Sequence, residues 1–126
     1  ANLINGLRCV RDSINSYVVD RVAMAGLKGA IEDEAYFQTV RGKVMATRER
    51  TADALGKMGF TVLPSRANFL FVSYPGVPGE RLLTGLRERG ILVRWWKDPL
   101  ISDWLRITIG TDDEMAALLA ALKELV

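Results

Sequence analysis

Two arginines stand in apolar stretches and are the side chains of this sequence best suited to bind an anion. Arg106 interrupts the alternating apolar run 105–109, and Arg94 follows the apolar run 91–93. Burying half of a guanidinium in a sheet costs free energy unless an anion pairs with it. Arginine binds carboxylates and phosphates with two parallel hydrogen bonds. Two such cations close together would form a pocket for a dianion.

Each of these arginines also has a structural interpretation. Arg106 could lie on the solvated face of a sheet or pair with Asp103 or Asp112, and Arg94 could be a surface charge at the end of a strand. Asn68 and Tyr17 are further candidates for lining a ligand site, through an amide and a phenol. An asparagine in such a position more often hydrogen-bonds to the local backbone, and packing explains Tyr17 equally well.

The lack of histidine excludes much of the usual catalytic chemistry. The chain has no histidine and one cysteine, Cys9, so it can form neither a zinc site of the usual type nor a Ser-His-Asp triad nor a Cys-His pair. We expect Cys9 to be a buried, inert thiol in a reducing cytoplasm. Catalysis would have to come from a carboxylate, lysine, tyrosine or arginine side chain, or from a bound cofactor.

The composition is that of a soluble globular domain. The 126 residues are 49% hydrophobic and 25% charged, with a formal net charge of +2. One core is expected, without nucleic-acid binding, since no run of five or more basic residues occurs. Trp95 and Trp96 would face opposite ways in a strand and so form no stacking platform; core or interface packing is expected for them. No stretch reaches the roughly 18–20 apolar residues of a membrane span.

Helical spacing of apolar residues predicts three helices in the first half of the chain. The first covers about 3–14, a second follows a break at Asn15-Ser16, and a long amphipathic helix runs from about Glu34 to a stop at Gly59. The second helix carries an apolar face that we expect to be packed. On the long helix, the arginines at positions 41, 48 and 50 are expected on faces away from the apolar stripe.

The second half of the chain alternates between strand and helix patterns. Strands are predicted at 60–62, 67–72, 91–93 and 105–109, and helices over 80–89 and after a capping box formed by Thr111 and Glu114. This order predicts an α/β (α+β) two-layer sandwich: a small, mostly antiparallel sheet covered by helices and preceded by two linking helices.

Several segments of the chain resemble one enzyme family in order and spacing. These segments are Asn15-Ser16-Tyr17, 32–37, Thr47-Arg48-Glu49-Arg50, 59–69, 86–94 and 105–111. Together they look like the C-terminal part of histidinol-phosphate aminotransferases, which are fold-type I pyridoxal-phosphate enzymes of aminotransferase class I/II.

The resemblance implies roles for the candidate residues. Arg106 matches the arginine that grips the substrate anion, which would be the phosphate of histidinol phosphate and the α-carboxylate of glutamate in turn. Arg94 matches a second arginine at that anion, and Asn68 and Tyr17 are weaker candidates for lining the site. No residue matches the Schiff-base lysine or the group that binds the cofactor phosphate, so no catalytic, cofactor-binding or metal residue is expected in the chain.

We therefore expect one part of a cytoplasmic, homodimeric enzyme of histidine biosynthesis. Residues 1–32 would link to an absent pyridoxal-phosphate domain, and residues 33–126 would be the small domain, inactive alone. Threonine-phosphate decarboxylases and other aminotransferases share the Arg106 motif and remain alternatives. So do a stand-alone regulatory module that binds a small anion or an amino acid, and a structural dimerisation piece.

Overall fold

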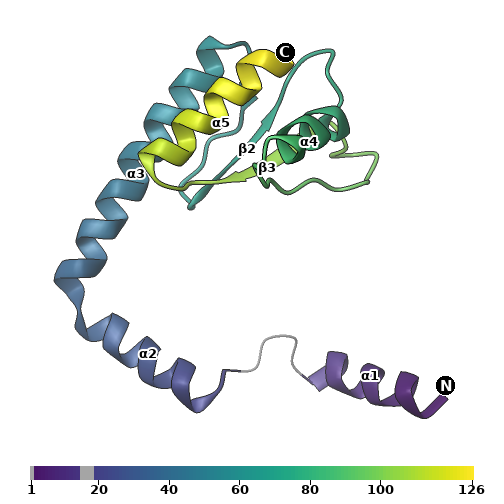
Figure 1. Cartoon of the computed structure of the whole chain (residues 1–126). Helices are drawn as coiled ribbons and strands as arrows, with labels where there is room; N and C mark the ends of the chain where they lie inside the picture. Colours follow the sequence, from purple (N-terminus) through teal and green to yellow (C-terminus); the bar gives the residue numbers. More distant parts are fainter. Residues whose placement is uncertain (1, 15–18) are drawn as a thin grey trace. The chain divides into compact units, whose positions relative to one another are not determined.

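The computed structural model describes residues 2–14 and 19–126. Its contacts divide the chain into two compact units, residues 1–38 and residues 39–126. Each unit is described by itself below, and Figure 1 gives the order and labels of the elements.

The first unit consists of exposed helices. It holds α1 (Asn2–Ile14), α2 (Arg21–Glu32) and the start of α3 (Glu34–Lys57). Asp20 begins α2 by accepting a hydrogen bond from the Ala23 N–H at 2.8 Å, so this helix starts later than the expected cap at Asn15-Ser16, which lies outside the described residues. No side chain of α2 is buried.

Two expectations about this unit are therefore wrong for the described residues. The apolar face of α2 was expected to be packed, yet Val22 is 82% exposed. Cys9 was expected to be buried, yet it is an exposed free cysteine of α1. The spacing of apolar residues shows which face of a helix can pack against another surface. It does not show whether that surface belongs to the same stretch of chain.

The second unit begins with the continuation of α3, which ends at a glycine as expected. Gly59 has a φ of 95°, a backbone conformation that favours glycine. The Phe60 N–H donates to the Leu55 carbonyl and the Gly59 N–H to the Gly56 carbonyl, both at 3.0 Å. This pair of bonds satisfies carbonyls that the end of the helix leaves free and turns the chain into the sheet.

The sheet of this unit is antiparallel and has three strands. Its strands β1 (Thr61–Val62), β2 (Phe69–Ser73) and β3 (Trp104–Thr108) are arranged in the order β1-β2-β3. In the register of β2 and β3, Leu70 lies opposite Ile107 and Phe71 opposite Arg106. Side chains alternate between the two faces, so Leu70 and Ile107 share the buried face and Phe71 and Arg106 the other.

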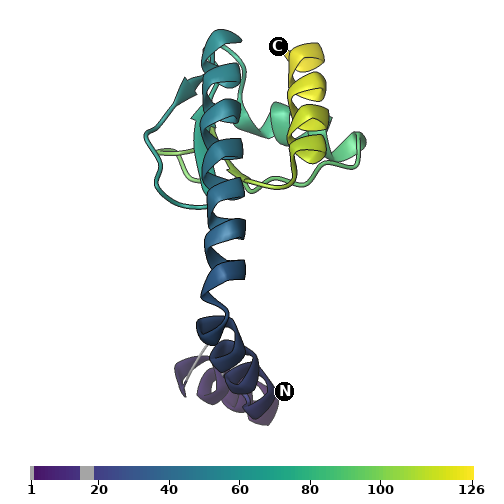
Figure 2. The ribbon, with the colours of Figure 1, turned by 90° about the vertical axis from the view of Figure 1, so that its left-hand side faces the viewer.

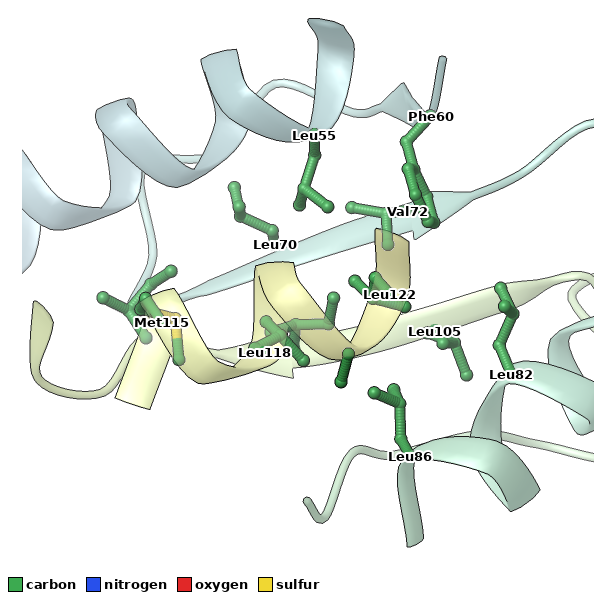
Figure 3. Close-up of a cluster of buried hydrophobic side chains, with 13 residues drawn as sticks. Leu55, Phe60, Leu70, Val72, Leu82, Leu86, Leu105, Met115, Leu118 and Leu122 are labelled. Atoms are coloured by element: carbon green, nitrogen blue, oxygen red, sulfur yellow. The ribbon is translucent and has the colours of Figure 1, made fainter. Parts of the chain in front are cut away.

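Helices cover only the buried face of the sheet. The helices α4 (Gly79–Glu88) and α5 (Asp112–Leu125) join α3 around one hydrophobic core. Figures 1 and 2 show the second unit from two directions, and Figure 3 shows leucines of α3, α4 and α5 around the side chains of the strands. The expected capping box starts α5: Thr111 accepts from the Glu114 N–H, and the Glu114 side chain accepts from the Thr111 N–H. The predicted two-layer fold is thus confirmed.

Two details differ from the predictions for this unit. Residues 91–93 form no strand; the segment is bridged to β3 only at Arg94. Arg48, expected on an outward face of α3, is only 8% exposed. Its Nη1 donates to the Ala67 carbonyl at 3.1 Å, and this hydrogen bond explains how a charged side chain is tolerated there.

Candidate functional site

Arg106 lies in the middle of β3, on the face of the sheet that no helix of the second unit covers. Its neighbours Leu105 and Ile107 are 0% and 1% exposed, whereas Arg106 itself is exposed. The alternation of β3 therefore turns the guanidinium away from the core, as the sequence pattern indicates.

Arg94 is held directly beside Arg106 by the backbone. The Arg94 N–H donates to the Arg106 carbonyl at 3.0 Å, and the Arg106 N–H donates to the Arg94 carbonyl at 2.8 Å. Residues paired in this way across an antiparallel bridge project to the same face. The two cations that the sequence singles out, 12 positions apart, are thus neighbours on the open face.

Aromatic rings surround this pair of arginines. The Arg106 Cζ lies 5.4 Å from the ring centroid of Phe69 and 5.5 Å from that of Trp96. The Arg94 Cζ lies 5.3 Å from the centroid of the same Trp96 ring. These distances are within the range in which the negative ring face attracts a cation. We call the two arginines with Phe69 and Trp96 the arginine cluster.

No carboxylate of the described chain forms an ion pair with either arginine of the cluster. Asp112, one of the two partners considered for Arg106, is engaged elsewhere. Its Oδ1 accepts from the Arg50 Nη2 at 2.5 Å and from the Thr47 hydroxyl at 2.6 Å. Asp103 forms no ion pair among the described residues. Pairing of Arg106 with Asp103 or Asp112 is therefore wrong, and both guanidiniums of the cluster can bind an anion.

The contacts of Asp112 predict a dependence of stability on pH. The pKa of Asp112 lies below its ordinary value of 3.8, because the Thr47 hydroxyl and then the Arg50 guanidinium donate hydrogen bonds to the ionised carboxylate. A carboxyl whose pKa is lower in the folded state stabilises the fold above its unfolded pKa, and this contribution is lost as pH falls through the folded pKa. We expect Asp112→Asn to lower the free energy of unfolding near neutral pH and to have little effect well below the folded pKa of Asp112.

Urea unfolding of the wild type and Asp112→Asn at both ends of this pH range checks that prediction. Asp113→Asn is the matched control, because Asp113 is an exposed aspartate one residue further along α5. An equal destabilisation by Asp112→Asn at the two pH values would show that the ionised carboxylate is not the source of the effect.

Asn68 directly precedes β2, and its backbone is tied to the residue that follows β3. Its carbonyl accepts a hydrogen bond from the Ile109 N–H at 2.8 Å, and its side chain is exposed. Arg48 holds the preceding residue, Ala67, by the hydrogen bond described above. Sequence reasoning missed this buried arginine, whose only signal was its place within the family-like segment 47–50. Tyr17, the remaining candidate, lies outside the described residues.

The described residues do not fit a pyridoxal-phosphate site. The chain contains five lysines, and every one of them is exposed (Lys28, Lys43, Lys57, Lys97 and Lys123). A lysine that forms a Schiff base is usually activated by desolvation or by a neighbouring cation. Among the described residues, no three potential metal ligands lie together, and no helix is long and apolar enough to cross a membrane.

The sequence matches a known enzyme family. The sequence profile of the family "Aminotransferase class I and II" matches residues 1–122. The histidinol-phosphate aminotransferase 2 of Rhizobium meliloti (strain 1021) is 52% identical over 124 residues, which cover 98% of this chain and 35% of that protein. The histidinol-phosphate aminotransferase of Clostridium acetobutylicum is 45% identical, with the same coverage.

A solved structure extends the likeness to three dimensions. The histidinol-phosphate aminotransferase of Sinorhizobium meliloti, in complex with pyridoxal-5'-phosphate, matches 92% of this chain and 33% of that one, with a TM-score of 0.77 and 27% identity. The chain thus spans about a third of the length of the relatives that it matches. Because the family profile covers nearly the whole sequence, the chain belongs to the aminotransferase class I and II family.

Proposed function

We propose that this chain acts as the C-terminal small domain of a histidinol-phosphate aminotransferase and supplies the arginines that bind the anionic end of the substrate. The full protein would convert histidinol phosphate and 2-oxoglutarate to imidazole acetol phosphate and glutamate, a step of histidine biosynthesis. The observation that carries the proposal is the pair Arg94 and Arg106, which share one sheet face without a carboxylate partner among the described residues. Relatives at 45% and 52% identity that bear this enzyme name support the substrate.

The two guanidiniums would act on the substrates by binding and orientation. Arginine donates two parallel hydrogen bonds to a phosphate or a carboxylate, so the bound anion has a defined direction as well as a position. The same pair could hold the phosphate of histidinol phosphate in one half-reaction and a carboxylate of glutamate in the other. Fixing the anionic end restricts where the amino group of the substrate can lie, which lowers the entropic part of the barrier.

The open position of the arginine cluster indicates that another surface completes the site. Both arginines are exposed in the described chain, and an ion pair in contact with bulk water contributes little. Covering the anion with a second surface would exclude water and strengthen the interaction. We assign that surface to a cofactor domain elsewhere in the protein, to which residues 1–32 would link and over which residues 33–126 would close.

The exposed helices of the first unit support this organisation. Leu3, Leu7 and Val10 on α1 are 76%, 59% and 56% exposed. Apolar rows of this size on a helix usually meet a partner surface. We expect that partner to be the cofactor domain, in a cytoplasmic protein that forms a homodimer at full length.

Pyridoxal phosphate would be held outside these 126 residues. When bound, it supplies the electron sink of transamination, and the residues described here would contribute only to substrate binding. We expect the chain alone, incubated with pyridoxal phosphate and borohydride, to give no stoichiometric adduct at any single lysine. Peptide mass mapping of the reduced chain checks this, and full labelling of one lysine would contradict it.

Steady-state turnover by the full-length protein tests the proposed function. We expect glutamate and imidazole acetol phosphate to form from 2-oxoglutarate and histidinol phosphate. Release of carbon dioxide from threonine phosphate instead would indicate a decarboxylase. Tight calorimetric binding of a small anion by the chain, without turnover by the full-length protein, would indicate a regulatory module.

A further inference from the structure

Two adjacent tryptophans of the second unit have different surroundings. Trp95 packs against the hydrophobic core, and its Nε1 donates a hydrogen bond to the Ser102 carbonyl at 2.6 Å. Trp96 instead belongs to the arginine cluster, with the Cζ atoms of Arg94 and Arg106 at 5.3 Å and 5.5 Å from its ring centroid. Core or interface packing was expected for both rings, and of the two only Trp95 packs against this core.

The ring of Trp96 also contacts an aromatic side chain of the sheet. Its ring meets that of Phe71 edge to face, with centroids 6.4 Å apart and an interplanar angle of 70°. Phe71 lies opposite Arg106 in the register of β2 and β3. The exchange of both backbone hydrogen bonds between Arg106 and Arg94 leaves Arg106 and Phe71 as a non-hydrogen-bonded pair, the closer kind of pair in antiparallel sheets. The ring of Trp96 thus contacts Phe71 of β2, the residue directly opposite Arg106 of β3.

We propose that Trp96 is the positioning residue of the anion site: its ring holds both guanidiniums on the open face of the sheet before an anion arrives. This inference rests on the proposed function and adds a residue to it. Two neighbouring guanidiniums that have no ion-pair partner among the described residues repel one another, and each long arginine side chain loses rotamer freedom when it is fixed. Attraction to a shared ring offsets part of that repulsion and reduces the ordering left to be done on binding.

The test uses the full-length protein with Trp96→Leu, which removes the ring face but keeps apolar bulk. We expect the KM values for histidinol phosphate and glutamate, and the inhibition constant of inorganic phosphate, to rise by about 5- to 30-fold, as loss of two cation–π contacts predicts. The kcat should change much less, because the ring is proposed to order the binding site only. Trp96→Phe, which keeps a smaller ring, should fall between the wild type and Trp96→Leu.

Trp104→Leu is the matched control on the same face of the sheet. Trp104 stacks on Phe71 with centroids 5.1 Å apart, but no arginine of the described residues lies over its ring. Constants for Trp96→Leu equal to those of this control would overturn the inference. Should Trp96→Leu fail to fold, unchanged constants for Trp96→Phe would overturn it in the same way.

A double variant separates positioning from a merely structural effect. In an Arg106→Ala background, Trp96→Leu should raise the phosphate inhibition constant by a smaller factor than in the wild type, because one of its two cations is gone. Equal factors would contradict the proposal. Failure of Arg106→Ala itself to weaken either substrate would instead refute the proposed function, so the two failures are distinguishable.

Discussion

Replacing Arg106 by alanine in the full-length protein is expected to lower kcat/KM for both histidinol phosphate and glutamate. Loss of a charged partner from a desolvated site costs about 2–4 kcal/mol, which corresponds to a 30- to 900-fold decrease. The reason lies in the position of the side chain: it has no carboxylate partner among the described residues and sits beside a second arginine. Steady-state kinetics with each substrate varied in turn measures the effect.

Arg87→Ala is the control for that substitution. Arg87 is an exposed arginine in the last turn of α4, and its removal should leave both kcat/KM values within about twofold, as for most surface changes. The proposal that one anion site serves two substrates requires parallel losses. A variant that lost activity with histidinol phosphate alone would show that glutamate is bound by other groups.

The largest expected effect on stability comes from the core beneath the site. Leu122 of α5 is 0% exposed and belongs to the cluster that joins the helices to the sheet (Figure 3). We expect Leu122→Ala to lower the free energy of unfolding by about 2–5 kcal/mol, because it removes buried surface and leaves a cavity. Such a loss is a large part of the roughly 5–15 kcal/mol that stabilises a typical domain. Urea unfolding monitored by far-UV circular dichroism measures it.

Leu100→Ala provides the comparison for the same chemical change at the surface. Leu100 is 88% exposed, so its truncation should change the free energy of unfolding by less than about 0.5 kcal/mol. Similar effects of the two substitutions would mean that α5 does not pack on the sheet as described.

The sequence alone predicted most elements of the second unit, because their signals are local. The Thr111–Glu114 capping box and the glycine stop after α3 depend on residues that lie close together in the chain. Residues 91–93 were predicted as a strand and are not one. Whether an apolar run forms a ladder depends on the partner offered by a distant segment, and here β3 pairs with it only at Arg94.

Site residues were predicted unevenly, for a related reason. Arg106 could be found because it breaks an apolar alternation, and the pattern also indicated its face of the sheet. Its contact with Trp96 could not be found, since the bridge that brings Arg94 to Arg106 is a long-range feature. The burial of Arg48 likewise depends on the Ala67 carbonyl, 19 residues away. Burial of a charge is decided by such partners and not by helical periodicity.

Joint binding of the anionic end of the substrate by Arg106 and Arg94 can be seen in a crystal structure of the full-length protein with histidinol phosphate. We expect phosphate oxygens within hydrogen-bonding distance of both guanidiniums, at about 2.7–2.9 Å for charge-assisted bonds. A phosphate bound elsewhere, with Arg106 still facing solvent or paired with a carboxylate, would contradict it.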